Sequence, residues 1–203
     1  MARVSFFIDG FNVYHSLKND FNYHKYLWLD YRRFLQKFVR KIDTLADIFY
    51  FSAYAHWNQN RVKRHRMLVD IWKSTGIITI MGDFKEKDRF CKNCKTYFKS
   101  HEEKQTDVNI GIYLIKEAYV NSYDTAILVT NDTDLIPAIR MLKSTFPQKR
   151  VGVLFPIDRW SSELYQECHF WRKTKKKHLS KSQLSDTVTL PSGIVFQRPQ
   201  SWK

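Results

Sequence analysis

The sequence has no long hydrophobic run and few cysteines. No apolar stretch in its 203 residues reaches the roughly 18 residues that a membrane-spanning helix requires. The segment from Met1 to Asp9 is too short in its apolar part to act as a signal peptide. Three cysteines in a chain without an export signal do not indicate a disulfide framework. We therefore expect a cytoplasmic protein that does not associate with a membrane.

Two motifs of common enzyme classes are also missing. The sequence has no glycine-rich loop that could surround a nucleotide phosphate, and no Gly-x-Ser-x-Gly segment that would present a nucleophilic serine. It has no internal repeat, and its only low-complexity segment is one basic run near the C-terminus. These absences argue against P-loop nucleotide hydrolysis and against serine-hydrolase chemistry.

Acidic residues are few relative to basic ones. There are 34 Lys and Arg against 20 Asp and Glu, which gives a net charge of +14 and a pI near 9.7. An excess of this size is typical of proteins whose partner is a polyanion such as nucleic acid. The 43% hydrophobic content is ample for a packed interior, and the length fits one domain with additions.

Apolar runs alternate with segments of helical periodicity along most of the chain. We expect strands at 3–8, 47–54, 77–81, 124–130 and 150–155, and helices at 11–18, 31–42, 58–75, 104–119 and 135–142. This alternation predicts an α/β fold with a doubly wound, mostly parallel sheet of order 3-2-1-4-5.

The expected core covers residues 1–173, with a polar, cysteine-containing insertion at 83–103. Residues 174–203 are expected to form a basic tail with a hairpin around Pro191 to Gly193.

Aspartates follow two strands that this order makes neighbours. Asp9 closes the first strand, and Asp132 and Asp134 follow the strand that ends at Thr130. The carboxylates should face one crevice at the carboxyl edge of the sheet, where they repel one another unless a cation neutralises them. Oxygen ligands favour Mg²⁺ or Mn²⁺. Each aspartate alone could instead serve as a turn residue or a helix cap.

Three segments resemble, in this order, the sequence blocks of the bacterial NYN domain family, in particular its LabA-like group, which belongs to the PIN-like nucleases. They are Phe7 to His15, Glu103 to Asn109 and Val129 to Ile136. The likeness spans about residues 3–170, and the ending Leu190 to Trp202 is similar to the tail of some members. The resemblance implies an NYN domain over residues 1–173 with a PIN-like, Rossmann-type sheet.

The resemblance also implies a set of functional residues. The expected ligands of Mg²⁺ or Mn²⁺ are Asp9, Asp107, Asp132 and Asp134, and Asn12 would orient a ligand, a water or a phosphate. The implied activity is a metal-dependent ribonuclease that hydrolyses RNA phosphodiester bonds without a covalent intermediate.

Two other functions are compatible with parts of this pattern. A catalytically silent RNA-binding or scaffold module would keep the fold and the basic surface, and it would show no activity that a chelator abolishes. A phosphatase of the haloacid-dehalogenase kind also has Asp after the first strand, but it needs a second Asp two residues later, where this sequence has Phe11. The sequence leaves open whether two copies pair as a homodimer.

Basic residues on the helix expected at 58–75 are the predicted RNA contacts: Arg61, Lys63, Arg64 and Arg66. We expect Lys104 on the same helix face as Asp107, where it would contact a phosphate or pair with the carboxylate. The run from Arg172 to Lys181 is a second basic surface. Nearby aromatic side chains could stack on unpaired bases, namely Tyr54, His56 and Trp57. A solvated helix face is the alternative interpretation.

Cys91 and Cys94 have the spacing of a zinc knuckle. A structural zinc site needs four ligands, and the sequence shows only one such pair. His101 could be a third ligand, and Cys168 or His169 a distant fourth. Two free thiols at a tight turn are the alternative, and the sequence does not decide between them.

Overall fold

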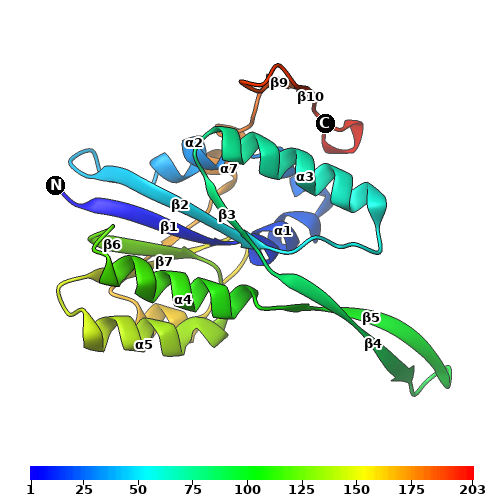
Figure 1. The fold of residues 1–203 in the computed structure, drawn as a ribbon, viewed down its shortest axis with the longest axis horizontal. Coiled ribbons are helices and arrows are strands. Elements are labelled where there is room, and N and C mark those ends of the chain that lie inside the picture. The colour runs from blue at the N-terminus through cyan, green and yellow to red at the C-terminus, as the bar shows by residue number, and fades with distance from the viewer.

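Six parallel strands form the central sheet of the computed structural model, which describes all 203 residues (Figure 1). The strand order is β3-β2-β1-β6-β7-β8. Their bounds are β1 (Arg3–Asp9), β2 (Thr44–Ser52), β3 (Ile78–Met81), β6 (Thr125–Val129), β7 (Arg150–Phe155) and β8 (Phe170–Lys173). All five pairings are parallel. The doubly wound sheet predicted as 3-2-1-4-5 is confirmed, with one further strand beside β7.

The additional strand, β8, carries little sequence signal. Two aromatic residues are followed directly by two basic ones, and three of its four residues are exposed, as an edge position allows. Gly152 makes the pairing possible, because a Cβ atom there would lie within 2.3–2.7 Å of the Phe170 ring. The pairing of β8 with β7 therefore depends on a glycine in the neighbouring strand.

Helices cover both faces of the sheet (Figure 1). One face carries α1 (Gly10–Lys18), the 3₁₀ segment η1 (Phe21–Leu27), α2 (Tyr31–Gln36), α3 (Gln59–Ser74) and α7 (Lys176–Ser180). The other carries α4 (Thr106–Tyr119), η2 (Thr133–Leu135), α5 (Ile136–Thr145) and α6 (Ser162–Glu167). Successive strand residues point to opposite faces, so Phe6 and Ile8 join the first core and Phe7 the second. None of the helices is long and apolar enough to cross a membrane.

Two expected helix starts have side-chain caps. Asp30 accepts from the Arg33 amide at 2.9 Å, and Asn58 accepts from the Arg61 amide at 3.0 Å. The end of the first of these helices was predicted wrongly, because α2 stops at Gln36 and does not continue to residue 42. The next three amides bond three residues back, which closes the helix in a turn. Ile42, the last residue of the expected helix, is 64% exposed.

The polar insertion expected at 83–103 is a regular antiparallel hairpin that projects from the domain (Figure 1). Its strands are β4 (Asp83–Cys91) and β5 (Thr96–Lys104). Most of its side chains are exposed, so cross-strand pairs hold it rather than a core. The strand β5 leads directly to α4, so the base of the hairpin lies at the start of that helix.

The C-terminal tail contains the predicted hairpin, formed by β9 (Thr187–Thr189) and β10 (Val195–Gln197). Gly193 adopts a φ of 83° in its turn. The short η3 (Gln200–Trp202) then places Trp202 in the first core, where its ring centroid lies 6.2 Å from that of Trp28. Arg198 donates to the carbonyl of Lys25 at 2.7 Å, which fastens the tail to η1.

Trp202→Ala should therefore lower the free energy of unfolding by about 3 kcal/mol, because truncating a buried tryptophan leaves a cavity. Urea denaturation followed by circular dichroism measures this loss. Phe21→Ala is the matched control, since Phe21 is an aromatic residue of the same region that is 84% exposed, and it should change stability by less than about 0.5 kcal/mol. Equal denaturation midpoints for the two variants would show that the tail does not support the core.

Candidate metal centre

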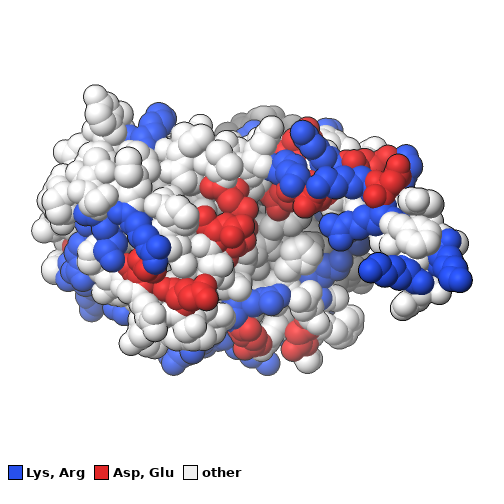
Figure 2. Space-filling model, turned by 90° about the horizontal axis from the view of Figure 1, so that it is seen from below, with Lys and Arg blue, Asp and Glu red and all other residues white.

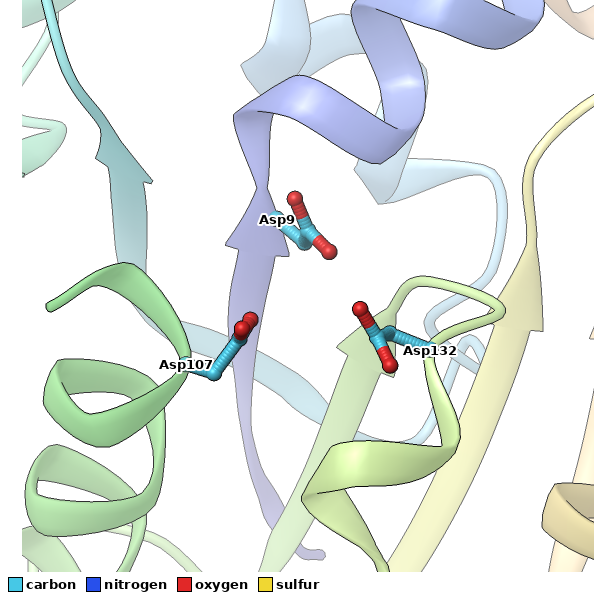
Figure 3. A group of neighbouring side chains, drawn as sticks. All are labelled: Asp9, Asp107 and Asp132. Carbon is cyan, nitrogen blue, oxygen red and sulfur yellow. The ribbon is translucent and has the colours of Figure 1, made fainter. Parts of the chain in front are cut away.

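Three aspartates converge at the carboxyl edge of the sheet (Figure 3). Asp9 ends β1, Asp132 lies in the loop after β6, and Asp107 belongs to the first turn of α4. One carboxylate oxygen of each lies within 4.8 Å of the others. The structure thus brings together three of the four aspartates that the sequence singled out.

Parallel pairing places the first two of these groups. Ile8 is paired with Val129, so the chains leave β1 and β6 side by side at the same edge. The third group, Asp107, does not come from a strand. It comes from α4, which starts at the base of the hairpin and covers the face of the sheet that carries the second core (Figure 1). The site therefore needs the crossover and the hairpin as well as the strands.

Asp9 is buried and held by three hydrogen bonds. Asn12 donates to it twice, from its backbone amide at 2.9 Å and from Nδ2 at 2.8 Å, and the Thr130 hydroxyl donates at 2.9 Å. The Asn131 amide in turn donates to Asn12 Oδ1 at 3.3 Å. Burial raises the pKa of Asp9 despite these donors, and the charge of Asp132 raises it further. Asn12 therefore orients Asp9 and ties it to the loop after β6.

The neighbouring carboxylates make the ionised form of Asp107 less favourable. Burial raises the pKa of Asp107 to about 6, with additional repulsion from Asp132, Asp9 and Asp134. None of these four aspartates has a Lys, Arg or His nitrogen within 4.0 Å. The protein supplies no cation of its own for the cluster.

The donor set fits a hard divalent cation. All three groups offer carboxylate oxygen, which suits Mg²⁺ or Mn²⁺ better than zinc. Two oxygens that bind one Mg²⁺ at about 2.1 Å lie about 3 to 4 Å apart, so the present spacing is close to that of ligands on a single ion. Asp9, Asp107 and Asp132 are thus the residues that could hold such a metal.

Asp134 lies at the border of the cluster rather than among the three converging oxygens. It is exposed, and its backbone amide donates to Asp132 Oδ1 at 3.0 Å. Its charge contributes to the raised pKa of Asp107. It supports the loop that presents Asp132, and its expected role as a ligand stays a prediction.

Comparison with known proteins gives a family for this arrangement, since the NYN domain model matches residues 3–172. The chain belongs to the NYN domain family. NYN domains are part of the PIN-like nuclease superfamily, in which divalent metals are the typical cofactors. Membership of the LabA-like group stays a prediction.

Two individual proteins are similar to this NYN domain. The chain is 30% identical over 105 residues to 6-hydroxy-3-succinoylpyridine 3-monooxygenase HspA from Pseudomonas putida, a match covering 50% of this chain and 33% of that protein. The chain thus matches about a third of that relative's length. The crystal structure of a protein of unknown function from Vibrio parahaemolyticus has a TM-score of 0.60 and 17% identity, over 90% of this chain and 96% of that one. This likeness supports the fold alone.

A fourth acid of this NYN domain, Glu103, was missed in the sequence. Burial, together with the nearby charges of Asp9, Asp107 and Asp132, raises the pKa of Glu103 to about 8. The Thr106 hydroxyl donates to its Oε1. Its place depends on Gln105, whose φ of 77° turns the chain between β5 and α4. Glu103 lies in the same NYN sequence block as Asp107, and this position could have identified it from the sequence.

The expected placement of Lys104 was wrong. It is the last residue of β5, and α4 begins only at Thr106, so it does not share a helix face with Asp107. The left-handed Gln105 ends the helical register that the spacing assumed. Lys104 Nζ lies 3.2 Å from Glu102 Oε2, and its contact with RNA stays a prediction.

The possible zinc ligands do not converge. Cys91 pairs with Thr96 at the tip of the hairpin, whereas His101 pairs with Glu86, five positions nearer its base. Cys168 is buried in the second core, away from the hairpin. The only group of three or more potential ligands is the aspartate cluster.

Beside the acidic cluster lies a cavity of about 310 Å³, enclosed mainly by α1, α3 and β2. Of the four basic residues of α3 expected to bind RNA, Arg61 and Arg64 line it, and Lys63 and Arg66 do not. His65 also lines it, with Nε2 3.0 Å from the Tyr50 hydroxyl. Burial lowers the pKa of His65 to about 4.

The second basic surface lies elsewhere. Residues of the run from Arg172 to Lys181 border an open groove between β8, α7 and the turn after α2, together with Lys37 and Arg40. The groove is wide and open to the surface. It offers positive charge without the enclosure of the cavity next to the aspartates.

The partly buried imidazole of His65 gives the NYN domain an acid-sensitive position. With a pKa near 4 in the folded state and 6.5 ordinarily, the unfolded chain binds the proton first, so the stability contributed by neutral His65 falls as the pH drops from about 6.5 to 4. His65→Gln should reduce the loss of stability over this window, measured by urea denaturation at several pH values. His56→Gln, at an exposed site, should keep the parent pH dependence.

Metal binding provides a direct test of the cluster. Asp9→Asn, Asp107→Asn or Asp132→Asn should each weaken Mn²⁺ binding in calorimetry by at least about tenfold, because even a partner of a metal ligand contributes about 10- to 100-fold. Asp88→Asn, an exposed acid of the hairpin, is the control and should bind as the parent does. The same measurement on Asp134→Asn separates a ligand from a neighbouring charge. Parent affinity in all three cluster variants would refute the site.

Proposed function

We propose that this NYN domain is a metal-dependent ribonuclease that hydrolyses RNA phosphodiester bonds at Asp9, Asp107 and Asp132 with Mg²⁺ or Mn²⁺. The observation that carries the proposal is the convergence of three carboxylates without a cationic partner at one edge of the sheet. Family membership and the net charge of +14 support it. RNA as the substrate class comes from the family.

The residues around the cluster suggest how the chain would serve this reaction. A bound divalent cation would stabilise the negative charge on the phosphate and make a water more acidic. The three aspartates would hold that cation, and Asn12 and Thr130 would keep the Asp9 carboxylate in place through their hydrogen bonds. The proposed course is direct attack by water, without a covalent intermediate.

The charged surface suggests where the strand would run. Figure 2 shows carboxylates gathered near the centre of one face, with Lys and Arg side chains toward both ends of that face. A polyanion would be held by the basic regions while the carboxylates meet it only through the cation. The proposed contacts are those expected from the sequence, namely Arg61, Lys63, Arg64, Arg66 and Lys104.

The similarity to the Pseudomonas monooxygenase does not change this proposal. It covers a third of that protein, and the name describes the whole relative. A catalytically silent RNA-binding module remains the second outcome that the experiment below distinguishes.

Cleavage of end-labelled single-stranded and structured RNA, with Mg²⁺, Mn²⁺ or EDTA in parallel, tests the proposal. Asp132→Asn should abolish cleavage while RNA binding survives or tightens, because the variant loses a metal ligand and also a charge that repels phosphate. Asp88→Asn should cut at the parent rate. Cleavage in EDTA, or full activity of Asp132→Asn, would contradict the metal mechanism, and binding without any cleavage would identify the silent module.

A further inference from the structure

We propose that the cavity beside the aspartate cluster receives one unstacked base of a single-stranded RNA, while Arg61 and Arg64 hold the adjoining phosphates. The proposal rests on the proposed nuclease function and specifies how its substrate is held. It rests on four features of the cavity: its position, its aromatic walls, its unpaired cations and its size.

The cavity and the cluster share a wall. Gly10 and Phe11, which directly follow Asp9, both line the cavity. A Cβ atom on Gly10 would lie 2.7 Å from the Phe51 carbonyl and from the Tyr50 ring, so only glycine lets α1 approach β2 so closely. A strand whose phosphate reaches Asp9 would therefore lie next to the cavity.

Aromatic rings form much of the lining and the mouth. The interior includes Tyr31, Tyr50 and Trp72. At the mouth, the Trp57 indole stacks on the His101 imidazole, with centroids 3.7 Å apart and planes 14° apart. Trp57 is still 43% exposed, so a base can extend this stack. Such walls favour a flat heteroaromatic group over an aliphatic chain or a free inorganic anion.

The polar groups at the cavity favour an anionic ligand. Arg61 and Arg64 lie one turn apart on α3, and neither has a carboxylate within 4.0 Å. His15 also lines the cavity, and burial together with the charges of Lys18 and Arg159 lowers its pKa. An aromatic chamber with unpaired guanidinium groups at its side matches a base joined to phosphate.

Size sets the number of bases. A volume of about 310 Å³ lies at the lower end of ligand cavities, which run from about 300 to 1,000 Å³. The cavity thus suits one base rather than a stack of several. The remaining nucleotides would lie along the basic surface outside.

The helix α3 offers a matched pair of variants for the test. Arg61→Ala with Arg64→Ala removes the two cations that line the cavity, and Lys63→Ala with Arg66→Ala removes the same charge from other positions of the same helix. The probe is a fluorescein-labelled ten-residue oligoadenylate, whose affinity is measured by anisotropy in EDTA at several salt concentrations. The first variant should bind at least about tenfold more weakly, and its log–log salt slope should fall by about 1.4, the value for two lost phosphate contacts. The second should weaken binding several-fold less than the first, because Lys63 and Arg66 would contact the strand only outside the cavity. Equal losses in the two variants would overturn the proposal.

A second comparison tests the base itself. Trp57→Ala should weaken binding of the oligoadenylate by about 5- to 100-fold, the range for loss of one base stacked on an aromatic side chain. The same variant should bind an abasic oligomer of equal length as the parent does. Tyr97→Ala on the hairpin, where the ring is 76% exposed, is the control and should leave both affinities unchanged. An equal effect of Trp57→Ala on both oligomers would show that the cavity does not hold a base.

Adenosine monophosphate distinguishes a strand from a free nucleotide. It should bind more weakly than the oligomer, and equal affinity would overturn the assignment to RNA. Because all these measurements exclude metal, they are independent of cleavage. Selective binding without any nuclease activity would support the base site and contradict the proposed reaction. Cleavage without these differences in binding would support the reaction and contradict the base site.

Discussion

The pairing of β1 with β6 is the constraint on which the rest of the structure depends. It joins residues more than a hundred positions apart and brings Asp9 beside the loop of Asp132. The hydrogen bonds from Asn12 to Asp9 and from the Asn131 amide to Asn12 then link the two strand ends directly. Everything else at the site is added to this pair: α4 brings a third carboxylate, and α1 leads from Asp9 into the cavity wall.

Gathering acids at this edge opposes folding in the absence of a cation. Burial and mutual repulsion raise the pKa of Asp9, Asp107 and Glu103, which means that each ionised form is less favoured there than in water. Such groups persist in a marginally stable protein when function needs them and the surrounding core supplies the stability. Here that stability comes from two aromatic-rich cores, one on each side of the sheet.

The two sides of the site have contrasting chemistry. The cluster is acidic and suited to a cation, whereas the neighbouring cavity is aromatic and bordered by unpaired arginines. A nucleic acid strand carries both complementary parts, because its phosphate can share a metal with the carboxylates and its base can enter an aromatic chamber. Gly10, which directly follows Asp9, lines the cavity and so joins the two parts.

The sequence by itself determined five of the six strands of the sheet, their order and the aspartates at two strand ends, because buried parallel strands are apolar runs and their carboxyl ends share one edge. It did not determine what depends on single turns or on distant partners. The left-handed conformation of Gln105 turns Glu103 toward the cluster and keeps Lys104 outside the helix. A positive φ at a residue other than glycine leaves no pattern in the sequence, so the sequence could not predict this turn. Phe38, just after the early end of α2, packs against His178 of α7. Gly152 leaves the space that the Phe170 ring of β8 occupies. The cavity, too, was decided only by the tertiary structure, because its lining comes from segments between residue 10 and residue 202 that have no relation in the sequence until the core assembles.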